Sequence, residues 1–172
     1  GLHLAEEYSF WQRVFAELGF RTTLPRDADE MLSRGKQLQG AEFCSPVAAF
    51  HGQVAELLGR ADFVFVPIHL EKPDPENHRR AYCYYTQFTP SVVKGAVTPE
   101  QGERLLTPVM WGGGRDPAGE FAQALEAAVP STQIHPNEVR RAMRVAREAQ
   151  EKAITFLTRE FERQRRPQEA DE

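Results

Sequence analysis

The sequence lacks any long apolar run, and this absence argues against a membrane-spanning helix. Its 172 residues are 41% hydrophobic and 27% charged. No stretch approaches the roughly 18–20 consecutive apolar residues that a bilayer span needs. A basic segment followed by an apolar one is also missing near the N-terminus, so no secretory signal is recognised. We therefore expect a cytoplasmic protein without membrane contacts.

Cysteine is scarce, and its two copies do not form a familiar metal motif. Cys44 and Cys83 are far apart in the sequence, with no CxxC pair and no cysteine–histidine cluster at zinc-finger spacing. A chain of this length buries enough apolar surface to fold without a disulfide. Any metal site must therefore be assembled from distant parts of the fold.

A basic excess is absent as well. The formal net charge is −4 at pH 7, whereas dedicated nucleic-acid binders usually carry a basic patch. Nucleic acid is therefore not an expected partner. The phosphate-binding pattern GxxxxGK followed by Ser or Thr is also missing. We expect this chain by itself neither to hydrolyse ATP nor to turn over a substrate.

Apolar residues recur at helical spacing in some segments and form short continuous runs in others. Helices are predicted over residues 4–18, 28–34, 45–58, 118–128 and 136–165, with a further short helix beginning at Thr89-Pro90. Strands are predicted over residues 20–24, 42–44, 62–68, 81–85 and 105–111. This alternation indicates an α/β fold.

The predicted fold is a Rossmann-like three-layer domain with a mostly parallel sheet, plus a long C-terminal helix. We expect the domain over residues 1–134, the helix over 135–166 and a disordered tail over 167–172. The chain opens on a helix, where such folds usually open on a strand, so we expect a fragment of a larger protein. The alanine-rich stripe of the long helix is expected to pack on a missing part of the protein or on a neighbouring copy.

Both cysteines fall where a predicted strand is followed by a helix. Ser45 and Pro46 are typical of the N-cap and the first position of a helix, so Cys44 is expected beside a helix N-terminus. Such a position favours the thiolate, which is the form that binds metal. In open parallel sheets this edge is where ligands bind. The alternative is that both cysteines are small buried packing residues.

Several motifs together resemble a known family. They are Tyr8–Trp11 with Phe15–Phe20, Glu42–Pro46, His51–Val54, Ala61–Pro67 and Cys83–Pro90. They are similar to the cysteine-containing domain of large proteins related to the activators of 2-hydroxyacyl-CoA dehydratases, often described as CoA-substrate-specific enzyme activases. The match is closest over residues 8–95 and looser over the final helix. Tyr84 stands where this family usually has proline after the second cysteine.

This resemblance implies a [4Fe–4S] cluster held by three cysteines, of which Cys44 and Cys83 match the first two. The third ligand is expected from a later half-domain, outside this chain. Ser45, His51 and Gln87 are expected beside the ligands. The implied partners are the remainder of the parent chain, including an ATPase module, and an acyl-CoA dehydratase or similar redox protein.

Three interpretations remain open. The first is a non-catalytic part of an activator-type redox protein, in which the cysteines hold a cluster for ATP-linked low-potential electron transfer to acyl-CoA chemistry. The second is a structural or docking domain in which the cysteines only pack. The third is a zinc site made by Cys44, Cys83 and a histidine such as His51.

Overall fold

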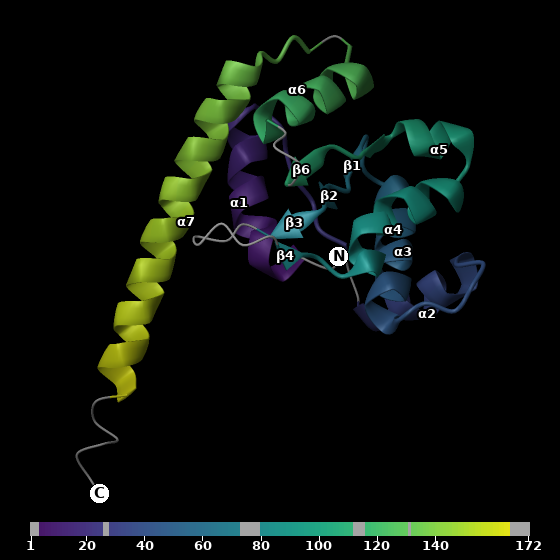
Figure 1. Cartoon of the computed structure of the whole chain (residues 1–172), viewed down its shortest axis with the longest axis horizontal. Helices are drawn as coiled ribbons and strands as arrows, with labels where there is room; N and C mark the ends of the chain where they lie inside the picture. Colours follow the sequence, from purple (N-terminus) through teal and green to yellow (C-terminus); the bar gives the residue numbers. More distant parts are fainter. Residues whose placement is uncertain (1–3, 26–27, 73–79, 112–115, 131, 166–172) are drawn as a thin grey trace, which may run out of the picture.

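A computed structural model describes residues 4–25, 28–72, 80–111, 116–130 and 132–165 (Figure 1). The helices along these residues are α1 (Leu4–Glu17), α2 (Ala28–Leu38), α3 (Ser45–Leu58), α4 (Tyr84–Gly95), α5 (Pro99–Glu103), α6 (Pro117–Ala128) and α7 (Pro136–Arg165). The strands are β1 (Val64–Phe65), β2 (Ile68–His69), β3 (Glu71–Lys72), β4 (Arg80–Ala81), β5 (Leu105–Leu106) and β6 (Val109–Trp111). The chain is therefore a mostly helical α/β protein.

A pair of parallel strand segments forms the centre of the fold. β1 pairs with β5, and β2 pairs with β6, both in parallel. The N–H groups of residues 64, 66 and 68 donate to the carbonyls of residues 104, 106 and 108 at 2.9, 2.8 and 2.8 Å. The strands predicted within residues 62–68 and 105–111 are thus confirmed, and the structure shows that they lie side by side. Their pairing is divided into two short sheets, and β3 and β4 form a separate antiparallel pair.

Helices cover both faces of this strand pair. Leu105 packs in a cluster with α3 and α4, whereas its neighbour Leu106 packs with α1, α6 and α7. Successive side chains of a strand point to opposite faces, so Leu105 and Leu106 contact the helices on the two opposite faces of the strand pair. This double burial explains why the two strands read as continuous apolar runs.

Aromatic rings fill the larger of the two clusters. Phe121 of α6 is fully buried, and its ring centroid lies 5.5 Å from Trp11, 5.4 Å from Phe15 and 5.4 Å from Phe65. The first half of α7 completes this cluster with Val139, Ala142, Met143 and Ala146. The core thus joins α1, α6, α7 and the strands into one unit.

Two glycines allow α2 and α3 to cross in close contact. A Cβ atom on Gly35 would lie 2.5 Å from the carbonyl carbon of Ala48, and one on Gly52 would lie 2.7 Å from that of Met31. The predicted end of the second helix at residue 34, just before Gly35, is wrong, because α2 continues to Leu38. Gly35 serves the helix contact rather than a helix stop.

Two of the predicted strands are not strands. Residues 20–24 and 42–44 make no sheet pairing. The ring of Phe20 packs against Phe15 at 6.1 Å, so burial of that side chain accounts for its apolar character. The carbonyl of Cys44 accepts the N–H groups of Val47 and Ala48 at 2.9 and 3.1 Å, so residues 42–44 lead directly into α3.

The region around Cys83 also differs from the prediction. The strand expected over residues 81–85 ends at Ala81, and α4 begins at Tyr84 rather than at Thr89. Pro90 therefore lies inside α4. A proline preceded by Thr is typical of a helix start, but the missing N–H is tolerated here. The short helix α5 was not predicted, although Thr98 and Gln101 form a capping box at its start.

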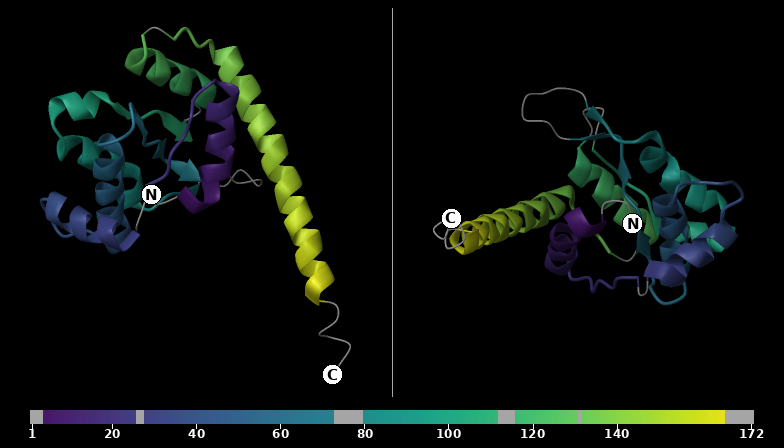
Figure 2. Two further views of the ribbon diagram at one scale, coloured as in Figure 1. Left: turned by 180° about the vertical axis from the view of Figure 1, so that it is seen from behind. Right: turned by 90° about the horizontal axis from the view of Figure 1, so that it is seen from below.

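The long helix α7 covers residues 136–165, as predicted. Figures 1 and 2 show that its second half extends past the rest of the chain. The expected division at residue 134 stays a prediction, and the expected tail 167–172 lies outside the described residues. No helix in the described ranges has the length and apolarity that a bilayer crossing requires.

Asp116 links the start of α6 to α7, and this link predicts an acid-sensitive contribution to stability. Its carboxylate accepts the N–H of Ala118 at 3.2 Å and a hydrogen bond from Arg140. The Arg140 hydrogen bond holds the pKa of Asp116 below its ordinary value. Because the pKa of Asp116 is lowered in the folded state, the stabilisation is fully present at pH values above the ordinary pKa of aspartate. It is lost as the pH falls through the pKa of the folded state.

Asp116→Asn is therefore expected to lower the melting temperature at about pH 7 and to have a smaller effect at about pH 3. Thermal melts of the wild type and the variant at the two pH values measure this. If the variant and the wild type differed in melting temperature by the same amount at both pH values, the stabilising role of the charged Asp116 would be contradicted.

Candidate functional site

Cys44 occupies the N-cap position of α3, one residue earlier than the sequence pattern suggests. Ser45 is the first helical residue and is exposed, and Pro46 follows it within the first turn. The thiol of Cys44 is exposed and makes no capping hydrogen bond. It therefore lies at the positive end of the α3 dipole and is free to bind a ligand.

Cys83 occupies the same kind of position at the start of α4. It is the N-cap residue of that helix, is exposed, and also makes no capping hydrogen bond. The expectation that a helix follows Cys83 after several residues is wrong, because the helix begins at the next residue. Since both cysteines are exposed, neither is a buried packing residue.

Aromatic side chains bring the two cysteine-bearing helix starts together. Phe43 precedes Cys44, and Tyr85 lies in the first turn of α4. Their ring centroids are 6.0 Å apart in an edge-on arrangement. Figure 1 also shows α3 and α4 as neighbours. The N-termini of the two helices thus converge on one region, which we call the two-cysteine site.

This site lies at the carboxyl end of the parallel strands. His69 is the last residue of β2, and its ring centroid is 5.7 Å from that of Tyr82. Tyr82 directly precedes Cys83. In open α/β sheets the carboxyl ends of parallel strands are the usual place of ligand binding.

His51, in the second turn of α3, is buried to all but 2% of its surface. Its Nδ1 is 2.8 Å from the carbonyl of Val47, and its ring stacks on Phe43 at 6.2 Å. A carbonyl only accepts, so Nδ1 carries a proton, and neutral His51 presents a lone pair at Nε2. Within the described part of the chain Nε2 has no hydrogen-bond partner.

Gln87 fixes the chain just before Cys83. Its side-chain amide donates to the carbonyl of Tyr82 at 2.8 Å, while its backbone N–H donates to the carbonyl of Cys83 at 3.2 Å. Gln87 therefore holds the turn that positions Cys83. It acts on the backbone rather than on the thiol.

The aromatic residues around the cysteines were not singled out as site residues by the sequence reasoning. Tyr84 and Phe88 form an exposed pair with ring centroids 4.4 Å apart, next to Cys83. Phe43, Tyr82 and Tyr85 make the contacts described above. The available signal was that aromatic residues flank both cysteines in the sequence.

Among the described residues, Cys44 and Cys83 are the potential metal ligands at this site. In the ranges that the structure describes, no three His, Cys, Asp or Glu side chains converge as metal ligands. His51 does not form such a group with Cys44 and Cys83. The zinc interpretation of the sequence therefore finds no support in the described part of the chain.

A cleft of about 700 Å³ is lined by α1, residues 19–25, α3, β1 and the first half of α4. At one side of it Glu7 accepts a hydrogen bond from Trp11 at 2.9 Å and lies 3.3 Å from Nε2 of the buried His69. Glu7 thus lies between Trp11 of its own helix and His69 at the end of β2, and these contacts bring α1 next to β2. The contact between Glu7 and His69 could not be predicted from the sequence, because the two residues belong to distant segments.

A family model described as the CoA enzyme activase uncharacterised domain matches residues 1–170 of the chain. The resemblance seen in the motifs is thereby confirmed and extends through α7. No curated protein and no solved structure gives a significant match.

Proposed function

Because the chain belongs to the CoA enzyme activase uncharacterised-domain family, we propose that it supplies two cysteine ligands, Cys44 and Cys83, to an iron–sulfur cluster. The cluster serves low-potential electron transfer linked to acyl-CoA chemistry in an activator-type protein. The observation that carries this proposal is the placement of both thiols, exposed, on two neighbouring helix N-termini.

The chemistry of these positions suits thiolate ligands. A helix N-terminus stabilises negative charge through its dipole and its free N–H groups. A cubane cluster is normally held by four thiolates, and the described residues offer two. The remaining ligands come from another part of the parent protein or from a partner. When bound, the cluster supplies one-electron redox chemistry.

The surrounding residues have separate roles in this proposal. Gln87 holds the backbone before Cys83, and Phe43 joins the start of α3 to the start of α4 through Tyr85. Ser45 begins α3 beside the first ligand. His51 is buried and its ring stacks on Phe43, which precedes the first ligand. The helix-covered parallel strands support a Rossmann-like arrangement for the whole domain.

The partners in this proposal are the ATPase module of the parent protein and an acyl-CoA dehydratase or similar redox enzyme. The described residues offer the electron site, and ATP hydrolysis belongs to the other module. The competing interpretation is a docking domain in which the exposed cysteines bind no metal. The exposed Tyr84 and Phe88 favour a contact surface in either case.

Electron paramagnetic resonance distinguishes these two functions. The chain is reconstituted anaerobically with iron and sulfide in the presence of a small thiol, which substitutes for the missing ligands, and is then reduced with dithionite. We expect the signal of a reduced iron–sulfur cluster. Ser45→Ala, beside the first ligand, is the matched control and retains the signal. Absence of any reducible cluster in the wild type would favour the docking domain.

A further inference from the structure

The second half of α7 exposes a row of large apolar side chains. Ile154, Leu157 and Phe161 are 57%, 64% and 62% exposed, and they lie three and four residues apart. That spacing places them on one side of the helix. An exposed apolar row of this kind on a helix is typical of a protein contact.

This row continues a contact that the first half of α7 already makes. Val139, Met143 and Ala146 have the same spacing and are buried against the rest of the fold. α1 and α6 are the helices that pack on α7 there. Nothing in the described ranges covers the row beyond Ala146, where α7 extends past the domain (Figures 1 and 2).

We propose that the second half of α7 pairs with the same helix of a second copy, in antiparallel orientation. The occupant is a second copy because Glu151 and Arg165, which border the row on one side, are complementary in charge when two copies of α7 run in opposite directions. Leu157 of each copy packs against Phe161 of the other, and these two equivalent contacts form the central layers of the pair. A helix with an apolar seam at this spacing associates in the manner of a coiled coil.

The position of the domain selects the antiparallel orientation. α1 and α6 already occupy the seam along the first half of α7, so a parallel partner would have to occupy the same space. In the antiparallel pair only the second halves overlap, over residues 151–165, or about 22 Å. The two domains then lie at opposite ends of the pair.

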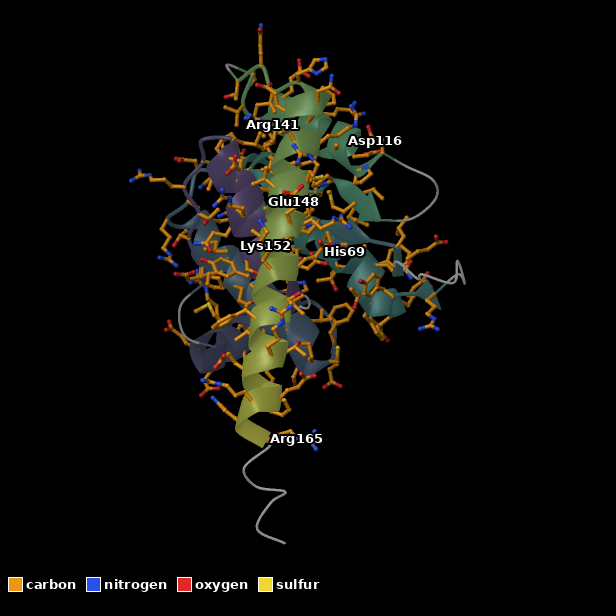
Figure 3. All side chains as sticks on the ribbon, turned by 90° about the vertical axis from the view of Figure 1, so that its left-hand side faces the viewer. His69, Asp116, Arg141, Glu148, Lys152 and Arg165 are labelled. Atoms are coloured by element: carbon orange, nitrogen blue, oxygen red, sulfur yellow. The ribbon has the colours of Figure 1, made fainter. Side chains whose placement is uncertain are left out.

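The charges that border the seam match this register. Glu151 and Arg165 lie on the same flank of the seam, fourteen residues apart. The register with Leu157 against Phe161 places Glu151 opposite Arg165 of the second copy, and this occurs twice in a symmetric pair. On the other flank Glu160 comes near Glu160 of the second copy, and Arg163 of the same helix, which pairs with Glu160 at 2.7 Å, offsets this like charge. Figure 3 looks onto the face away from the seam, which carries Glu148 and Lys152.

Sedimentation velocity over a range of protein concentrations tests the pairing. We expect a monomer–dimer equilibrium for the wild type. Leu157→Glu is expected to raise the dissociation constant at least about tenfold, because it places a charge in the seam. Thr155→Glu, which adds the same charge to the opposite side of the helix, is the control and retains the wild-type equilibrium.

Charge reversal tests the orientation. Glu151→Arg and Arg165→Glu are each expected to weaken dimerisation several-fold, and the double variant is expected to recover it. The two residues are about 21 Å apart along one helix, so recovery requires two chains. Circular dichroism verifies that every variant is folded.

Three results would overturn the proposal. They are a wild type that stays monomeric at high micromolar concentration, a dimer insensitive to Leu157→Glu, and a double charge reversal that fails to recover dimerisation. The first would mean that the row packs against something other than a second copy.

Discussion

Gly52→Ala is expected to destabilise the chain by at least about 3 kcal/mol, which is at the upper end of the cost of overpacking a core. The new Cβ would lie 2.7 Å from the carbonyl carbon of Met31 and still closer to its oxygen. Those atoms belong to the backbone of α2, so no side-chain rotation relieves the clash. The two helices must separate, and the start of α3, with Cys44, shifts with them.

Urea denaturation of Gly52→Ala measures this loss as a fall in the unfolding midpoint. Gly95→Ala is the matched control, because a Cβ at Gly95 meets nothing within 4 Å. Its stability is expected to stay within about 1 kcal/mol of the wild type, since alanine is the better helix former. Equal midpoints for the two variants would show that the α2–α3 crossing is not close.

Phe121→Ala is expected to cost about 3–5 kcal/mol, the usual cost of truncating a fully buried phenylalanine. Its ring contacts three other aromatic rings from α1 and from β1. The truncation therefore leaves a cavity where α1, α6 and the strands meet. Loss of the edge-on ring contacts adds to the cost of the cavity.

Phe88→Ala removes the same atoms from an exposed position and serves as the control. Phe88 is 45% exposed and contacts Tyr84 at the surface. Its truncation is expected to change the free energy of unfolding by less than about 1 kcal/mol. A comparable loss in both variants would contradict the placement of Phe121 at the centre of the core.

The parts of the fold that the sequence predicted correctly are those with strong periodicity. Residues 62–68 and 105–111 are continuous apolar runs because both faces of the strand pair are covered, and α7 keeps a regular stripe over thirty residues. Local sequence patterns were less reliable where the same residues are compatible with two different structures. Gly35 resembles a helix stop but serves a helix contact, and Thr89-Pro90 resembles a helix start but lies inside α4.

The cysteines of the candidate site could be predicted from the sequence, but the tertiary contacts that bring them together could not. The pattern at Ser45-Pro46 places a thiol at a helix N-terminus within one residue of the observed position. The convergence of α3 and α4 depends on ring contacts between residues about forty positions apart, such as Phe43 with Tyr85. Local sequence carries no such information.

The iron and acid-labile sulfide bound per chain, after anaerobic reconstitution with a small thiol, test the central claim most directly. We expect stoichiometric binding by the wild type and by Ser45→Ala. Cys44→Ser and Cys83→Ser are both expected to lose binding, because each variant removes one of two ligands held on neighbouring helices. Iron and sulfide retained by either cysteine variant, or bound by none of the proteins, would contradict the proposed cluster site.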